Sequence, residues 1–360
     1  MSNSDRSPSL SKGAFESLPG AVGSPPQHYG NPLGEQKRLA AGDAIVDLGG
    51  RGIVTVSGPD RLTWLDSLTS QSLARLTPGE SSETLQLDPN GHLEFAIRVV
   101  DDGETAWLLV DEGEGEPLAA WLLKMRFMLR VDIADVSGEF ATIGTFGQPE
   151  LPAVVTWVDP WTSVVAGGHQ YALTESHPGA DWSYRELVIP RSALPQAAAL
   201  PAAGTLALEA LRIAAWRPKF ASEVDDRSIP HELDWLRSAV HLSKGCYRGQ
   251  ETVAKVHNLG HPPRRLVLLH LDGSEGVLPA AGAVVSAGDK EVGHVTSSAL
   301  HYELGPIALA VIKRNTDPAA TLVVAADDVL VSAAQEIIVP TDAGAVADVP
   351  RLPRLGAVRR

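Results

Sequence analysis

The stretch LSKGCYRGQE, residues 242–251, holds the only cysteine in a chain of 360 residues. Cys246 lies two residues from Lys244 and two residues from Arg248, and neighbouring cations favour the nucleophilic thiolate form of a cysteine. The two glycines of this stretch allow unusual backbone angles and close approach of a ligand. A lone cysteine is also commonly a small buried hydrophobic residue. Both interpretations, a reactive thiol and a core residue, remain open from the residue types alone.

The region from His241 to Arg265 is a basic island in an acidic protein. The chain has a net charge of −14, which argues against a general nucleic-acid binder because phosphate backbones favour surplus Lys and Arg. Such a contrast indicates either an anionic ligand or a solvated face balanced by acids elsewhere. The island contains one acid, Glu251, and the cations Lys244, Arg248, Lys255, Arg264 and Arg265.

No metal site is expected from the histidines or from cysteine motifs. His257 and His261 have the i, i+4 spacing of a helical ligand pair, but Gly260 and the prolines at 262 and 263 favour a turn there. A single cysteine provides neither a CxxC redox pair nor a cysteine-based zinc site.

The elements that must position these residues follow an α+β pattern. Apolar spacing predicts a short helix in GPDRLTWLDSLTSQSL, a strand–turn–strand around Gly91 and two β runs broken like a hairpin at Gly49-Gly50. Strands are predicted over 163–175 and 182–190, followed by a helix over 206–216. Beyond Arg264 short β runs separated by Gly and Pro predict a small closed β-domain.

The two ends differ from the rest in composition. Residues 1–27 and 340–360 lack apolar periodicity, so we predict disordered tails. No run approaches 18 apolar residues, the first residues lack the apolar core of a secretory signal, and one cysteine suits a reducing compartment. We therefore expect a cytoplasmic protein with no membrane partner, and a monomer is the default.

The octamer KGCYRGQE, residues 244–251, resembles the KGCYxGQE signature of the YgfZ family, folate-binding proteins related to the aminomethyltransferase (T-protein) of the glycine cleavage system. VSGPDRLTWLDSLTSQ, LDPNGHLEFAIRV and EVGHVTSSALHYELGPIALAVIKR resemble further segments in the same order. The resemblance implies a ring around a central folate channel. It would be made of two α+β lobes, 28–145 and 146–262, and a C-terminal antiparallel β-barrel, 263–339.

The resemblance also implies a tetrahydrofolate site. Glu186 in RELVIP matches the glutamate that receives the pterin N–H groups, and Arg212 in LRIAAW matches an arginine that approaches folate. Ala214 and Trp216 depart from the family's LRxEAG pattern. Glu94 stands near the place of a catalytic aspartate, with aromatic Phe95 beside it, which makes glycine-cleavage chemistry the weaker expectation.

In the same resemblance Cys246 is the functional thiol. Lys244 and Arg248 would tune that thiol or hold the glutamate tail of folate, and Tyr247 would pack near the site. The implied function is a folate-dependent accessory role in assembling or maintaining iron–sulfur clusters of client enzymes, with indirect effects on tRNA modification. The alternatives are an aminomethyltransferase that transfers a one-carbon unit to tetrahydrofolate, and a binding-only scaffold with an inert Cys246.

Overall fold

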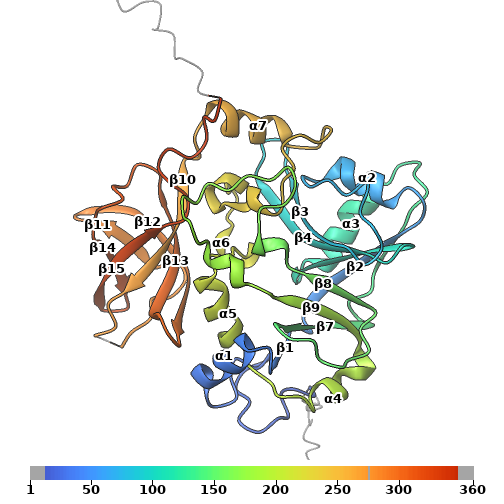
Figure 1. Ribbon diagram of the computed structural model, residues 1–360, viewed down its shortest axis with the longest axis horizontal. Coiled ribbons are helices and arrows are strands. Elements are labelled where there is room, and N and C mark those ends of the chain that lie inside the picture. The colour runs from blue at the N-terminus through green and yellow to red at the C-terminus, as the bar shows by residue number, and fades with distance from the viewer. Residues whose placement is uncertain (1–12, 275, 348–360) are drawn as a thin grey trace, which may run out of the picture.

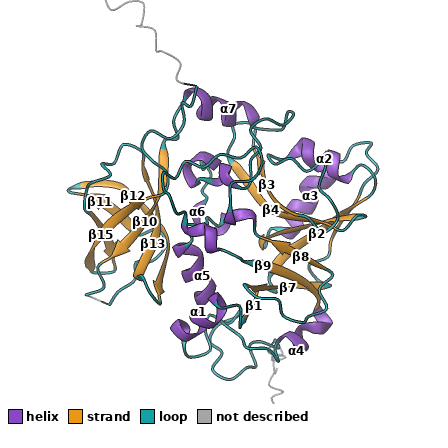
Figure 2. Cartoon of the chain, in the orientation of Figure 1, coloured by secondary structure: helices purple, strands orange, loops and turns teal. Residues whose placement is uncertain are grey.

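The computed structural model describes residues 13–274 and 276–347 and contains two β-sheets and a β-barrel. The barrel lies on one side of the molecule and the two sheets on the other (Figure 1). Helices occupy the space between them (Figure 2). These central helices are α1 (Pro32–Ala40), α5 (Thr205–Ala214) and α6 (Phe220–Glu223).

The first sheet is antiparallel, with strand order β3-β4-β5-β2-β6. Its apolar face packs against two helices, because Val54 and Val56 share a core with Leu65 of one helix and Leu118 of the other. The predicted short helix and the strand–turn–strand around Gly91 are confirmed. The elements are β2 (Arg51–Ser57), β3 (Ser81–Leu87), β4 (Leu93–Asp101), β5 (Thr105–Glu112), β6 (Asp132–Asp135), α2 (Arg61–Leu68) and α3 (Gly115–Met125).

The second sheet, of strand order β1-β7-β9-β8, shows that the hairpin prediction at Gly49-Gly50 was wrong. β1 pairs with β7, whereas β2 pairs with β5 and β6, so the two glycines carry the chain from one sheet to the other. The predicted lobe 28–145 therefore contains two strands of the second sheet. Its strands are β1 (Ile45–Asp47), β7 (Phe140–Thr145), β8 (Val155–Val158) and β9 (Arg185–Pro190).

The strand predicted over 163–175 is a loop in the structure. The buried carboxylate of Asp234 accepts hydrogen bonds from the backbone N–H groups of Tyr171, at 2.7 Å, and Ala172, at 3.4 Å. Because these two donors are satisfied by a side chain, and those of Val165 and His169 by the carbonyl oxygens of Arg237 and Leu236, the segment needs no neighbouring strand. Short helices complete this half: α4 (Leu194–Ala197) and the 3-10 helices Pro160–Thr162, Pro178–Asp181, Arg191–Ala193, Pro230–Leu233 and Trp235–Arg237.

The C-terminal domain is a closed antiparallel barrel of strand order β10-β13-β12-β11-β14-β15. Alternate residues of its first strand, Val267, Leu269 and Leu271, point into a separate apolar core. The predicted fold class, α+β with a C-terminal antiparallel barrel, is confirmed. The barrel strands are β10 (Arg264–Leu271), β11 (Val284–Ala287), β12 (Lys290–His301), β13 (Gly305–Lys313), β14 (Leu322–Ala326) and β15 (Val329–Ile337).

Parts of both predicted tails are ordered. Phe15 is 1% exposed and packs in a cluster with Ile45 and Ile189, so the disorder predicted for 13–27 is wrong; 1–12 lie outside the described residues. Ala343 is buried, and the backbone N–H of Val346 donates to the His257 carbonyl oxygen. Average composition cannot predict individual buried side chains and hydrogen bonds such as these. Residues 348–360 lie outside the described part of the chain.

Helix α7 (Gln250–Leu259) corrects the turn predicted at His257, which lies in its last turn. The helix ends only at Gly260, whose extended backbone terminates it. His257 Nδ1 lies 3.0 Å from the Tyr171 hydroxyl, whereas His261 Nδ1 lies 2.8 Å from the Ala343 carbonyl oxygen. Among residues 13–274 and 276–347 no His, Cys, Asp and Glu cluster could hold a metal ion, and no helix is long and apolar enough to cross a membrane.

Candidate functional site

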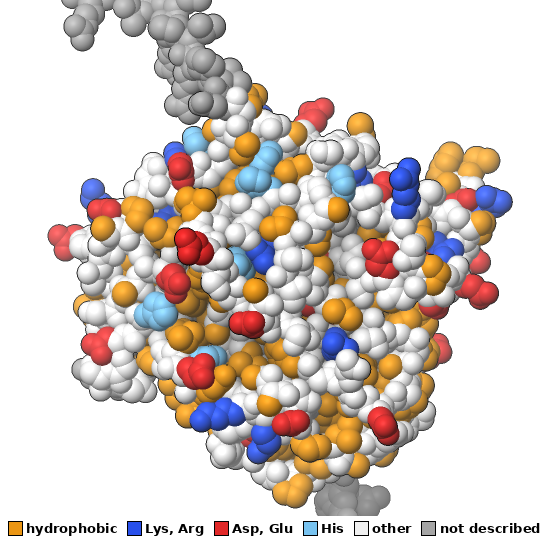
Figure 3. Space-filling view, viewed as in Figure 1, with side chains coloured by type: hydrophobic (Ala, Val, Ile, Leu, Met, Phe, Trp, Pro, Cys, Tyr) orange, Lys and Arg blue, Asp and Glu red, His pale blue; other side chains and the backbone are white. Residues whose placement is uncertain are grey.

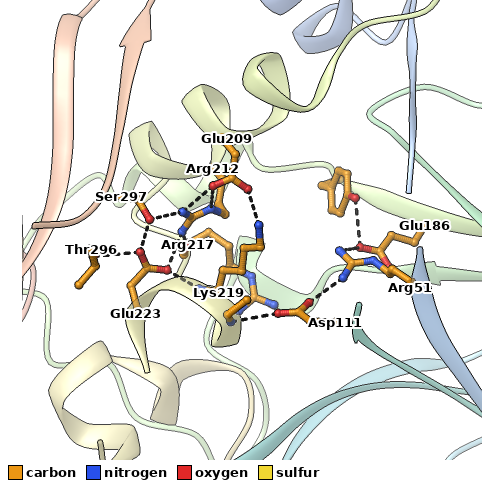
Figure 4. Close-up of polar contacts among 12 residues, drawn as sticks. Arg51, Asp111, Glu186, Glu209, Arg212, Arg217, Lys219, Glu223, Thr296 and Ser297 are labelled. Carbon is orange, nitrogen blue, oxygen red and sulfur yellow. Dashed lines mark hydrogen bonds and ion pairs between the residues drawn. The ribbon is translucent and has the colours of Figure 1, made fainter. Parts of the chain in front are cut away.

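A cavity of about 370 Å³ lies between the two sheets and the segment 205–221. Its walls carry many charged side chains, most of them paired with one another (Figure 4). Two residues predicted from the sequence, Glu186 and Arg212, line the cavity. Arg51, Arg98 and Asp111 also line it and were not predicted. The available signal was the presence of charged residues in or at the end of largely apolar strands: RGIVTVS, LEFAIRVVD and TAWLLVDE.

Glu186 is the most deeply buried carboxylate of this wall, with 0% exposure. Strand β9 places it between the neighbouring strands β7 and β8. Its Oε1 accepts hydrogen bonds from Arg51 Nη2 at 2.6 Å and from the Tyr184 hydroxyl at 3.1 Å, and Arg98 Nε lies 3.5 Å away. Its Oε2 has no hydrogen-bond partner. An ionised carboxylate survives burial only with such cations, and an unpaired oxygen is costly.

Arg51 connects Glu186 to a second carboxylate. Its Nη1 donates to Asp111 Oδ1 at 2.7 Å, and Arg98 also reaches Asp111, at 3.4 Å. Burial alone would raise the pKa of Asp111, but Arg98 and Arg51 outweigh it and hold that pKa below its ordinary value. The two carboxylates and two guanidinium groups therefore form a compact, charged network on one wall of the cavity.

Arg212 lines the cavity, but its donors are occupied. Its five N–H groups meet the Glu209 carboxylate twice, Glu223 Oε2 at 2.9 Å, the Arg217 carbonyl oxygen at 2.8 Å and Ser297 Oγ at 2.7 Å. A guanidinium has five N–H donors, so none remains for a ligand. Arg212 instead ties α5 to the barrel strand β12 and to α6.

The cavity also has a more exposed cation. Lys219 is 33% exposed, which exceeds the exposure of the lining arginines, and its Nζ lies 3.0 Å from Glu209 Oε1. Burial would raise the pKa of Glu209, but Arg212 and Lys219 lower it to about 2. Glu209 is therefore ionised, and Lys219 lies where the cavity approaches solvent.

The cysteine-containing loop forms a second site. Cys246 is exposed, so it is not the buried core residue that the sequence left open. Lys244 is 3% exposed, and its ammonium donates to the carbonyl oxygens of Asp66 at 2.5 Å, Thr69 at 2.9 Å and Gln71 at 2.6 Å. Burial lowers the pKa of Lys244, against the opposing charge of Asp66. Lys244 thus anchors the loop to the end of α2, and its ammonium is committed there.

The other predicted residues gather around this loop and not around the cavity. Arg248 Nη1 lies 3.4 Å from Glu94 Oε2, which also accepts from Gln86 Nε2 at 2.6 Å. Tyr247 is buried in the main core, with the Lys244 ammonium 5.5 Å from its ring centroid. None of these residues lines the cavity. The structure therefore divides the predicted site residues into two groups.

The basic island is not a single cationic surface. Arg264 pairs with Asp225 at 2.5 Å and with Glu232 at 2.8 Å, and Arg265 is buried with its donors on the Arg314 and Thr316 carbonyl oxygens. On the face shown in Figure 3, Lys and Arg side chains are scattered among acidic ones. These contacts agree with compensation of the charge run by acids elsewhere, but the Lys244 and Arg265 side chains are buried and belong to no solvated face.

Comparisons with known proteins agree with this architecture. Residues 264–337 match the family model described as glycine cleavage T-protein C-terminal barrel domain. The aminomethyltransferase of Moorella thermoacetica is 28% identical over 81% of this chain and 84% of its own length. That of a Nostoc species is 28% identical over 77% of this chain and 78% of its length. These matches support a relationship of this chain to the broader superfamily of aminomethyltransferase-like proteins.

A solved structure shows the same fold. The glycine cleavage system aminomethyltransferase T from Bartonella henselae superposes with a TM-score of 0.68, at 17% sequence identity, over 88% of this chain and 91% of that chain. At that identity the likeness establishes the arrangement of lobes and barrel.

A substitution at Gly249 tests how tightly the cysteine-containing loop packs against the rest of the protein. Gly249 has a φ of +82°, and a Cβ there would lie 2.7 Å from the Asp88 carbonyl oxygen, in the turn between β3 and β4. We expect Gly249→Ala to lower the free energy of unfolding by about 1–3 kcal/mol, measured by urea denaturation. Gly245→Ala is the matched control, because nothing lies within 4 Å of its Cβ position. Equal losses in both variants would contradict the tight packing of the loop.

Proposed function

We propose that the cavity binds a folate, with the pterin ring against Glu186. The observation that carries this proposal is a fully buried carboxylate with one unpartnered oxygen, Oε2, in a cavity wall. The pterin 2-amino group and the adjacent ring N–H are donors that a carboxylate can accept. The cavity volume, about 370 Å³, is in the range of small-molecule sites.

The charges around the cavity suggest how the ligand is oriented. Arg51 and Arg98 lie against Glu186 at the buried end, where the neutral pterin would lie. Lys219, at the more exposed end, is suited to the anionic glutamate tail. Arg212 positions α5 and does not contact the ligand in this arrangement. Curated relatives that are named aminomethyltransferases add support for a folate of the tetrahydrofolate type.

Glu186→Gln tests the pterin site. The amide keeps the volume of the side chain and loses the charge, so tetrahydrofolate affinity measured by anaerobic calorimetry should fall by about 10- to 100-fold, the loss expected for hydrogen bonds to a charged acceptor. Glu336→Gln, on the barrel surface, is the matched control and should bind like the wild type. Thermal unfolding of each variant confirms that the fold is retained. Unchanged affinity in Glu186→Gln would refute the site.

We further propose that the protein supports iron–sulfur enzymes through Cys246. The thiol is exposed, and the residue two positions before it is fixed to the end of α2, so the thiol is displayed at the surface to another protein. A single thiolate cannot hold a cluster alone, since clusters take about four protein ligands. The role is therefore a transient contact with a client enzyme or with an external thiol, and any influence on tRNA modification is indirect.

Cys246→Ala separates the thiol from the folate site. Because the cavity lining does not include the loop, the variant should bind tetrahydrofolate with the wild-type affinity. In a deletion strain it should fail to restore the activity of iron–sulfur enzymes, whereas Cys246→Ser shows whether a hydroxyl can substitute. Full restoration by both variants would show that the thiol is inert and would leave a binding-only scaffold.

The second candidate is an aminomethyltransferase, favoured by the 28% identity to curated enzymes of that name. The acid expected after the glycine turn, Glu94, does not line the cavity and bonds Gln86 and Arg248 instead. We therefore expect no ammonia when the protein is mixed with tetrahydrofolate and an aminomethyl-lipoyl carrier. Stoichiometric or catalytic release of ammonia, absent from a boiled sample, would establish this candidate instead.

A further inference from the structure

Arg51 occupies an unusual position in the cavity wall. Its guanidinium lies between two buried carboxylates, with Nη1 on Asp111 at 2.7 Å and Nη2 on Glu186 at 2.6 Å. Its Nε–H group is buried and has no hydrogen-bond partner. Paired with a carboxylate on each side, the Arg51 side chain is held in place, so this N–H has a defined position.

The unpartnered donor belongs to the same ion pair as an unpartnered acceptor. Glu186 Oε2 lacks a donor, Arg51 Nε lacks an acceptor, and both side chains line the cavity. Buried polar atoms are rarely left without partners, and a ligand is one way to satisfy them. A ligand that satisfies both atoms offers an N–H to Glu186 Oε2 and an acceptor oxygen to Arg51 Nε. The edge of a lactam, an N–H beside a carbonyl oxygen, offers such a pair.

We infer that Arg51 determines specificity by recognising the 4-oxo group of the pterin, while Glu186 accepts from the neighbouring ring N–H and 2-amino group. This inference rests on the proposed folate site and adds a residue to it. The pterin 4-oxo group is an acceptor and suits the Arg51 donor. A 4-amino group is itself a donor, and opposite Arg51 it would leave the guanidinium N–H unpaired.

The charges around Arg51 determine which of the two ligand groups, 4-oxo or 4-amino, the site prefers. Burial would lower the pKa of Arg51, but Glu186 and Asp111 outweigh it and hold that pKa above its ordinary value, so the guanidinium remains a donor at every pH of interest. Asp111 is itself held by Arg98 and by the backbone N–H of Ala221, at 3.1 Å. Because Arg51 cannot become a hydrogen-bond acceptor, a ligand that places a donor opposite it leaves an N–H group unpaired. That unpaired group lowers the affinity of such a ligand and makes the site specific for an acceptor.

Folic acid and aminopterin provide a matched pair of probes, because they differ in the oxo or amino group at C4. We expect the wild type to bind folic acid at least about 10-fold more tightly than aminopterin by calorimetry, the ratio expected for one hydrogen bond to a charged group. Arg51→Met removes the donor and should bring the two affinities within about threefold, chiefly by weakening folic acid. Arg51→Lys keeps a cation between the carboxylates but lacks the Nε–H group. This variant should also lose most of the preference for folic acid over aminopterin.

The outcomes separate this inference from the proposed function. Equal binding of folic acid and aminopterin by the wild type would retain a folate site and overturn the role of Arg51. A preference that persists unchanged in either well-folded Arg51 variant would overturn it as well. If the wild type binds neither probe nor tetrahydrofolate, both proposals fail. Thermal unfolding identifies a variant that has lost its fold, and the other variant then decides.

Discussion

The cavity depends on one buried ionic contact, that of the Arg51 guanidinium with Asp111 and Glu186. Arg51 and Asp111 belong to the first sheet and Glu186 to the second, so the contact joins the two sheets. Removing one partner of a buried pair leaves an uncompensated charge and typically costs about 3–5 kcal/mol, whereas the intact pair adds little net stability. The intact network therefore adds little net stability, whereas loss of one of its members would be costly.

A second buried network performs the same task between the lobes and the barrel. Arg212 on α5 and Glu223 on α6 meet Thr296 and Ser297 of β12, with Glu223 Oε1 accepting from both hydroxyls. Because these polar groups are satisfied within the protein, the cavity wall is preorganised before any ligand arrives. The cysteine loop is held separately, by the Lys244 ammonium on three carbonyl oxygens, which keeps an exposed thiol on a fixed support.

Local patterns predicted local structure well and long-range pairing poorly. The helix with leucines at 62, 65 and 68 and the turn at Gly91 were confirmed, because each is set by nearby residues. The barrel after Arg264 was confirmed as well, although it is closed by pairing of its first strand, β10, with its last, β15. Gly49-Gly50 was misassigned because a Gly-Gly link serves equally well as a hairpin turn or as a crossing between sheets. The loop at 163–175 was misassigned because its backbone donors are taken by Asp234, more than sixty residues away.

For the site, the amino-acid sequence by itself determined that Cys246 stands in a glycine-flanked loop and that Glu186 lies in a strand, since both depend on residue types within a few positions. Only the tertiary structure decided which charged side chains are free to bind a ligand and which are paired within the protein. It placed Lys244 on backbone carbonyls, committed all five Arg212 donors, and set Arg51 beside Glu186 across 135 residues of chain. The physical reason is that the state of a buried charge depends on its partners, and those partners come from distant strands.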